Sequence, residues 1–217
     1  MLAIAGGKGG CGKTTTAIGL ASVLGERGRD PLVVDADTDM PNVHHLVGLD
    51  TVGGIDAVAD GRSIERAIES PDSVPGVSVL TGGNRSSLAD ALDRLRRWPG
   101  PVLLDCPTGV NAGATRPLTA ARASLLVSTD QPQCLEDART TALVARNLAA
   151  TPCGALLWRT GESPVVRAIG DYPVLETVPT VDTVSFSDPR LRKPWRTLST
   201  AIFETDTSGG IFNRRWA

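Results

Sequence analysis

Aromatic residues are scarce in this chain of 217 residues: they make up 4% of it, and there is one tyrosine. Four cysteines occur, but no two form a C-x-x-C pair, so the spacing typical of zinc and iron–sulfur sites is missing. No apolar run is long enough to span a membrane. The sequence therefore gives no support to a metal-cluster protein, a disulfide scaffold or a membrane-spanning protein.

Neither sign of charge is in excess. Lysine and arginine number 22 and aspartate and glutamate 24, which gives a formal net charge of −2. A nucleic-acid site would therefore have to come from a local basic patch. The first expected strand starts at Leu2, which leaves no room for a signal peptide. We expect a cytoplasmic protein with four reduced thiols, since neither the length nor the composition suits a disulfide framework.

What the sequence does contain is a glycine-rich loop, GKGGCGKTT, at residues 7–15. It fits the phosphate-binding pattern G-x-x-x-x-G-K-[ST], in which glycines let the backbone N–H groups turn inward around a triphosphate. Lys13 can reach the β and γ oxygens, and Thr14 offers a hydroxyl to Mg²⁺. The loop residues expected to bind the nucleotide are Gly9, Gly10, Cys11, Gly12, Lys13, Thr14 and Thr15.

The surroundings of this loop suit the pattern. The apolar run Leu2–Ala5 before it predicts a short buried strand. After it, apolar residues repeat at helical spacing from Ala17 to Leu24, and Gly28 is placed to end the helix. A strand, a loop and a helix in this order are what a phosphate-binding loop requires, because the helix N-terminus then faces the anion.

Two further apolar runs, residues 32–35 and 101–105, end in aspartate. Ligands of open parallel sheets bind at the carboxyl ends of the strands, so Asp37 and Asp105 are expected beside the phosphate loop. Together with Thr14 they form the predicted Mg²⁺ site. The alternatives are a solvated turn at Asp37 and a strand-capping role for Asp105.

A second lysine, Lys8, precedes the pattern, and residues 8–15 resemble the deviant Walker A motif K-G-G-x-G-K-[ST]-[ST] of the MinD/ParA family of dimeric ATPases. Asp35-x-Asp37 resembles the switch I segment of that family, and residues 105–109 resemble its D-x-P-x-G switch II segment. The resemblance implies ATP and Mg²⁺ as cofactors and a homodimer that forms on ATP binding. It also implies that Lys8 crosses to the partner's ATP and that Asp37 orients the attacking water. Lys8, Lys13 and Asp37 are thus the expected catalytic residues.

The base-binding part departs from the family pattern. Family members carry an asparagine before an arginine at the end of a strand, and this asparagine contacts the adenine. Here Trp158 precedes Arg159. An indole can stack on a base but has a single N–H donor, which leaves the choice between adenine and guanine open. By the same resemblance, Pro179 and Asp182 belong to a loop beside the base.

The order of strands and helices predicts an α/β fold with a doubly wound, mostly parallel sheet flanked by helices, the P-loop NTPase fold. Further helices are expected at residues 55–59, 64–68, 87–97, 135–148 and 195–203. Residues 1–204 are expected to form a single ATPase domain. Residues 205–217 are expected to form a flexible spacer and a short basic-aromatic tail.

Two surfaces are candidates for the output of such an ATPase. The tail carries Ile211, Phe212 and Trp216, an apolar face that resembles the membrane-targeting tail of MinD and would bind an anionic membrane surface. This would place the protein peripherally at the inner face of the membrane. The rival is DNA binding through phosphate contacts, and a third outcome is that both segments only pack on the fold. The cations of the DNA hypothesis are Arg190, Arg192, Lys193 and Arg196.

The leading functional hypothesis is a slow, Mg-dependent ATPase switch that dimerises on ATP and positions or partitions a cellular structure. A protein activator or cargo is expected as its partner. The alternatives are a regulatory module that binds nucleotide with little or no hydrolysis and a ParA-like, non-specific DNA-binding partition ATPase. A metabolic kinase is disfavoured because Lys8 would have no role in one.

Overall fold

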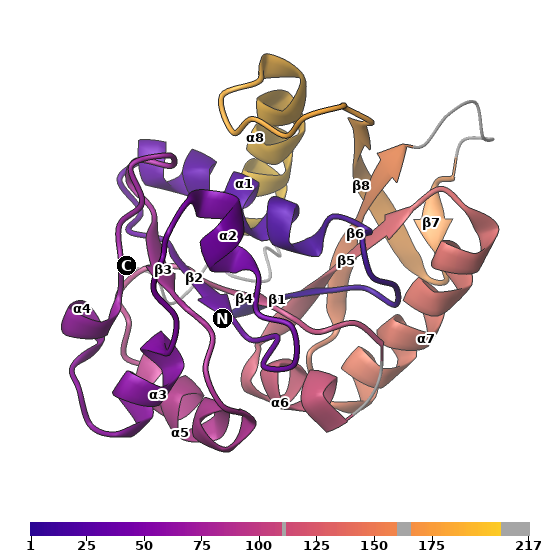
Figure 1. The fold of residues 1–217 in the computed structure, drawn as a ribbon. Coiled ribbons are helices and arrows are strands. Elements are labelled where there is room, and N and C mark those ends of the chain that lie inside the picture. Colours follow the sequence, from indigo (N-terminus) through magenta and orange to yellow (C-terminus); the bar gives the residue numbers. More distant parts are fainter. Residues whose placement is uncertain (110–111, 160–165, 205–217) are drawn as a thin grey trace.

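The structure is a computed structural model that describes residues 1–109, 112–159 and 166–204. Its centre is an eight-stranded sheet with the strand order β3-β2-β4-β1-β5-β6-β8-β7 (Figure 1). All neighbouring strands pair in parallel except β7 and β8. The predicted doubly wound, mostly parallel sheet is therefore confirmed.

The elements alternate along the chain as the sequence predicts. The strands are β1 (Leu2–Ala5), β2 (Leu32–Asp35), β3 (Ser78–Leu80), β4 (Val102–Asp105), β5 (Ala123–Thr129), β6 (Pro152–Arg159), β7 (Ala168–Ile169) and β8 (Tyr172–Pro179). The helices are α1 (Lys13–Glu26), α2 (Val43–Val47), α3 (Gly54–Ala59), α4 (Ile64–Ala67), α5 (Arg85–Leu95), α6 (Ala112–Ala120), α7 (Pro132–Asn147) and α8 (Pro189–Phe203).

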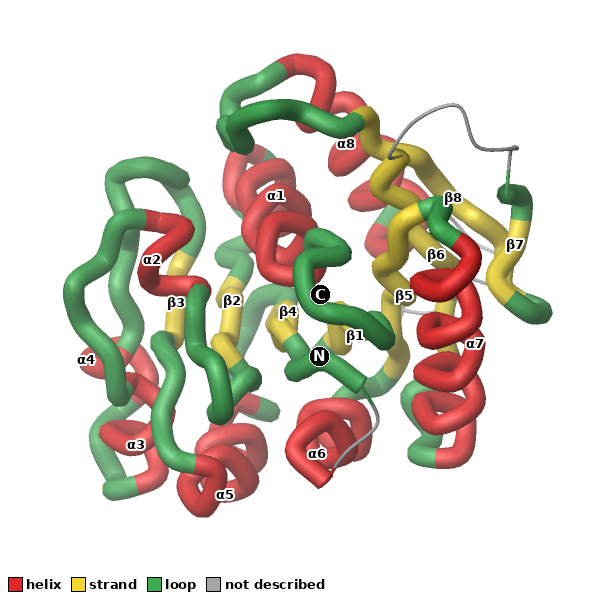
Figure 2. Tube along the Cα trace, turned by 45° about the vertical axis from the view of Figure 1, so that its right-hand side comes forward, coloured by secondary structure: helices red, strands yellow, loops and turns green. Residues whose placement is uncertain are grey.

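Helices cover both faces of the sheet (Figures 1 and 2). Helices α1 and α8 pack on one face, and α3, α5, α6 and α7 lie on the other. Helix α1 is buried along most of its length because it packs on the sheet and, at its side, against α8, which also contacts the sheet at β8. The contact is close: a Cβ added to Gly19 of α1 would lie 2.2 Å from Trp195 Cε2 of α8. Glycine at position 19 thus makes room for a fully buried indole.

The structure corrects three sequence-based expectations about the elements. Helix α8 begins at Pro189 rather than at residue 195, because the Asp188 carboxylate accepts the Arg190 backbone N–H and proline suits the first turn. Helix α6 and the short strand β7 were not predicted from the sequence. No helix in the described ranges is long and apolar enough to cross a membrane.

We expect the α1–α8 contact to contribute strongly to stability. Replacing Trp195 by alanine leaves a large cavity and should lower the free energy of unfolding by about 3–5 kcal/mol. Leu143→Ala is the control, because Leu143 is 55% exposed and its loss should change the value by less than about 0.5 kcal/mol. Urea unfolding followed by circular dichroism measures both. Equal effects of the two substitutions would contradict the packing described here.

Candidate functional site

A cavity of about 520 Å³ opens at the carboxyl ends of β1, β2 and β4, the edge at which the glycine-rich loop lies. Strands β2 and β4 are in register there, with Asp35 opposite Asp105. The residues that line the cavity are Gly9, Gly10, Gly12, Lys13, Thr14, Thr15, Asp37, Met40, Asn42, His45, Leu46, Asp105, Cys106 and Thr108. The fold thus brings the loop and the two aspartates predicted for the metal site, Asp37 and Asp105, to one cavity.

The loop has the backbone that an anion cradle needs. Gly10 and Gly12 have φ angles of 76° and 90°, in the left-handed region that favours glycine. The Cys11 side chain is buried, and its thiol donates a hydrogen bond of 3.3 Å to the Val127 carbonyl of β5. Burial raises the pKa of this thiol, so Cys11 is placed to anchor the loop and to contribute its backbone N–H. Lys8 is exposed at the rim of the cradle.

Thr14 and Asp105, two of the three residues predicted for the metal site, are in contact. The Thr14 hydroxyl lies 2.6 Å from Asp105 Oδ2 and 3.0 Å from Asn42 Oδ1. The second carboxylate oxygen, Asp105 Oδ1, is buried and has no hydrogen-bond partner among the described residues. A hydroxyl, a carboxylate and an amide oxygen are hard oxygen ligands of the kind that Mg²⁺ prefers, so these residues fit a Mg²⁺ ion.

The electrostatics of this edge suit a bound cation. Burial raises the pKa of Asp105 to about 7, although the hydrogen bond from Thr14 acts in the opposite direction. Burial likewise raises the pKa of Asp35 to about 6, against the backbone hydrogen bonds that it accepts. Both carboxyl groups are held where ionisation is costly without a compensating positive charge. The Lys13 ammonium supplies part of that charge to Asp105.

The two switch aspartates play different structural parts. Asp35 Oδ2 accepts hydrogen bonds from the backbone N–H groups of Asn42 at 2.8 Å and Val43 at 3.0 Å, which fixes the start of α2. Asp37 Oδ1 accepts weaker bonds from the backbone of residues 39 and 40, at 3.3 and 3.1 Å. Asp35 is thus a structural anchor, whereas Asp37 lies on a turn and lines the cavity.

Trp158 lies at the end of β6, beneath the phosphate loop. Its Nε1 donates a hydrogen bond of 3.2 Å to Thr16 Oγ1, and a Cβ added to Gly12 would lie 2.4 Å from the same nitrogen. Trp158 is therefore packed against the loop, and its one donor is already used. It is not among the residues that line the cavity.

The other base-contact residues lie at the same end of the sheet. Pro179 ends β8 opposite the Arg159 backbone in β6, and Asp182 is exposed just beyond. The Arg159 side chain is outside the part of the structure that is described. The roles of all four base-contact residues stay predictions.

The cavity also contains residues that the sequence analysis did not assign. Asn42 follows the Asp35-x-Asp37 segment, and its contact with Thr14 depends on how the chain before α2 folds over the loop. His45 lines the cavity, whereas His44 is buried, and the two imidazole rings are tilted against each other with their centroids 3.8 Å apart. The short helix α2 thus turns His44 inward and leaves His45 at the cavity.

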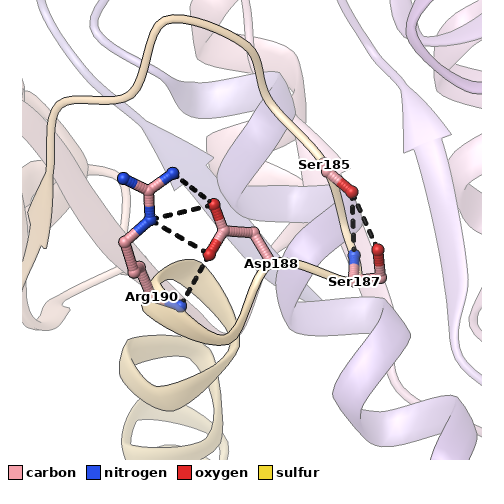
Figure 3. Close-up of polar contacts among 4 residues, drawn as sticks. All are labelled: Ser185, Ser187, Asp188 and Arg190. Carbon is pink, nitrogen blue, oxygen red and sulfur yellow. Dashed lines mark hydrogen bonds and ion pairs between the residues drawn. The ribbon is translucent and has the colours of Figure 1, made fainter.

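The cations of the DNA hypothesis are largely engaged within the fold. Arg190 pairs with Asp188 at 2.7 Å (Figure 3). Arg192 and Arg196 both lie against Glu26 of α1. Arg192 and Arg196 thus connect α8 to α1, whereas Arg190 pairs at the N-terminus of its own helix. A phosphate backbone would have to compete with these three ion pairs. The apolar tail of the membrane hypothesis lies outside the described residues.

Comparison with known proteins agrees with this geometry. A family profile described as the CobQ/CobB/MinD/ParA nucleotide binding domain matches residues 2–188. The chain belongs to this family. The predicted resemblance is thus confirmed.

Individual members are related at moderate identity. The septum site-determining protein MinD of Synechocystis is 27% identical over 149 residues, which is 64% of this chain and 56% of that protein. An uncharacterised ATP-binding protein of Methanocaldococcus jannaschii is 28% identical over 201 residues, 88% of this chain and 76% of that protein. The chain thus matches little more than half of the Synechocystis MinD.

A solved structure also resembles the chain. MinD of Pyrococcus horikoshii, complexed with Mg-ADP, superposes with a TM-score of 0.79 and is 25% identical, covering 91% of this chain and 93% of that chain.

Asp105→Asn should separate stability from metal binding. An amide keeps the shape and still accepts the Thr14 hydrogen bond, but it removes the buried charge. Without nucleotide the variant should therefore be more stable by about 1–3 kcal/mol. With Mg-ADP it should lose most of the added stability that the native protein gains from the ligand. Thermal unfolding without Mg-ADP measures the expected gain in stability, and unfolding with Mg-ADP measures the expected loss of stabilisation by the ligand. A variant that Mg-ADP stabilises as much as the native protein would contradict the metal assignment.

Proposed function

We propose that this protein is an ATPase switch: it binds ATP, forms a homodimer, and reopens on slow, partner-stimulated hydrolysis. The observation that carries the proposal is the arrangement of Lys13, Thr14, Asp37 and Asp105 around one cavity. Membership of the MinD/ParA-containing family and the Mg-ADP bound to the P. horikoshii MinD support ATP and Mg²⁺ as its ligands.

Each residue then has a defined task. The cradle at residues 9–15 binds the phosphates through backbone N–H groups, and the Lys13 ammonium neutralises the β and γ oxygens. Mg²⁺, when bound by Thr14 and Asp105, would offset further phosphate charge. Asp37 orients the water that attacks the γ-phosphate, in a reaction that depends mostly on positioning and charge stabilisation.

The second lysine supports the dimer. Lys13 is 7% exposed and already faces the phosphate site of its own subunit, whereas Lys8 is exposed at the rim. Two subunits that meet across their loops would bring Lys8 to the partner's phosphates. Within one subunit Lys13 already neutralises the phosphates, which leaves Lys8 available for the phosphates of the partner.

Substitution of the two lysines should have different effects. Lys13→Ala removes a buried charge from the phosphate site and should weaken ATP binding at least about 30-fold. Lys8→Ala should leave the affinity of the monomer within about twofold but abolish the ATP-dependent dimer and hydrolysis. Isothermal titration and light scattering measure the two properties. A Lys8→Ala variant that dimerises with ATP and turns over normally would refute the proposed role of this lysine.

The base is proposed to lie beyond the phosphates, at the carboxyl ends of β6 and β8. The residues of the predicted metal site lie on the β2–β4 side of the loop. A nucleotide whose γ-phosphate lies near them would extend across β1 toward β6 and β8. Trp158 has no donor left for a base, because its N–H binds Thr16. It therefore contributes stacking and no hydrogen-bond discrimination, and any preference for adenine comes from the loop that contains Pro179 and Asp182.

Nucleotide competition tests this view of the base. Trp158→Ala should weaken ATP and GTP by the same factor, about fivefold or more, because base–aromatic stacking depends little on the base. Trp158→Phe is the matched control, since it keeps an aromatic face without the N–H group. If Trp158→Ala left the affinities for both ATP and GTP unchanged, Trp158 would not belong to the nucleotide site.

The proposed output is the positioning or partitioning of a cellular structure, with a protein activator or cargo as partner. Its relatives include septum site-determining MinD proteins, which supports this class of output. Of the two candidate surfaces we prefer an anionic membrane, which the protein would bind through Ile211, Phe212 and Trp216. The protein would then be cytoplasmic and attach to the membrane peripherally. DNA binding through α8 is the weaker alternative, because three of its four cations are ion-paired in the fold.

A further inference from the structure

The loop that carries Asp37 is tied to a helix on the other side of the sheet. Arg85 Nη2, in the first residue of α5, lies 2.7 Å from both carboxylate oxygens of Asp39. Asp37 Oδ1 in turn accepts the backbone N–H groups of Asp39 and Met40. The side chain of Asp39 is therefore held by Arg85, while its backbone helps to hold the Asp37 carboxylate.

Arg85 itself is fixed by its neighbours. Its carbonyl accepts a hydrogen bond of 2.6 Å from Arg116 Nη1 of α6, the helix that follows β4. The preceding residue, Asn84, donates its backbone N–H to Asp56 of α3 at 2.9 Å. The start of α5 is thus attached to two other helices, and it offers the Asp37 loop a rigid point of support.

A second contact connects the same two segments. A Cβ added to Gly82 would lie 2.5 Å from Pro41 Cβ, so the chain just before α5 packs directly against the segment that follows the Asp37 loop. Residues 82–85 therefore touch this segment at both ends, once by packing at Pro41 and once by the ion pair at Asp39.

We propose that Arg85 is a positioning residue for Asp37, acting through Asp39. This inference rests on the proposed function, in which Asp37 orients the attacking water. The two side chains of the ion pair are 48% and 49% exposed, and such a pair contributes little to global stability. Its effect falls on the loop, because the Asp39 backbone that it holds donates to the Asp37 carboxylate.

The test compares Arg85→Ala, Arg85→Lys and Asp39→Asn. Loss of a half-exposed ion pair corresponds to a factor of about two to five. The Met40 amide, which donates to Asp37, should exchange its hydrogen faster by that factor in Arg85→Ala. The turnover number for ATP should fall by a similar factor, with KM unchanged. Arg85→Lys should keep both the Met40 exchange rate and the turnover number close to their native values, because it keeps a cation beside Asp39.

A double-mutant cycle supplies the decisive comparison. Arg85→Ala and Asp39→Asn combined should be no worse than either alone, because both remove the same interaction. Arg139→Ala, which breaks an exposed ion pair with Glu136 on α7, is the matched control and should change neither measurement. Unchanged Met40 exchange in Arg85→Ala, or fully additive effects in the double variant, would overturn the inference. A native protein that does not hydrolyse ATP would instead contradict the proposed function, and hydrogen exchange would still decide whether Arg85 holds the loop.

Discussion

The pairing of β2 with β4 is the constraint on which the candidate site depends. It sets Asp35 directly opposite Asp105, beside the strand that leads into the phosphate loop. Burial removes the hydration of both carboxyl groups, which is why both pKa values are raised, and the charge of Asp35 raises the pKa of Asp105 further. Such an edge is stable when positive charge is near, and Lys13 and a bound cation are placed to provide it.

The same constraint explains how the rest of the chain is arranged around α1. A helix whose first residue is Lys13 cannot turn away from the sheet, since its N-terminus must face the cavity. Beside it on the same face lies α8, through the fit of Trp195 against Gly19. The arginines of α8 then meet Glu26 near the end of α1. Side chains that look like a basic patch in the sequence thus serve helix packing.

The segments that carry the switch residues have a different character. Asp37 and its neighbours form a turn with long hydrogen bonds, whereas Asp35 accepts two short ones. A loop of this kind can change position at small energetic cost, and its resting place is then set by a few contacts from outside. The ion pair between Asp39 and Arg85 is one of them, and it connects chemistry at the end of β2 to helices on the opposite face.

The sequence by itself determined the phosphate loop, the strands that end in Asp35 and Asp105, and the parallel α/β class, because glycine spacing and apolar runs are local signals. It did not determine the start of α8, where a side-chain cap at Asp188 extends the helix, or the inward turn of His44. Only the tertiary structure showed that the Trp158 N–H is used by Thr16 and that Arg85 meets Asp39. Those contacts join residues far apart in the chain, and their geometry is fixed by strand order and helix packing, which no local pattern records.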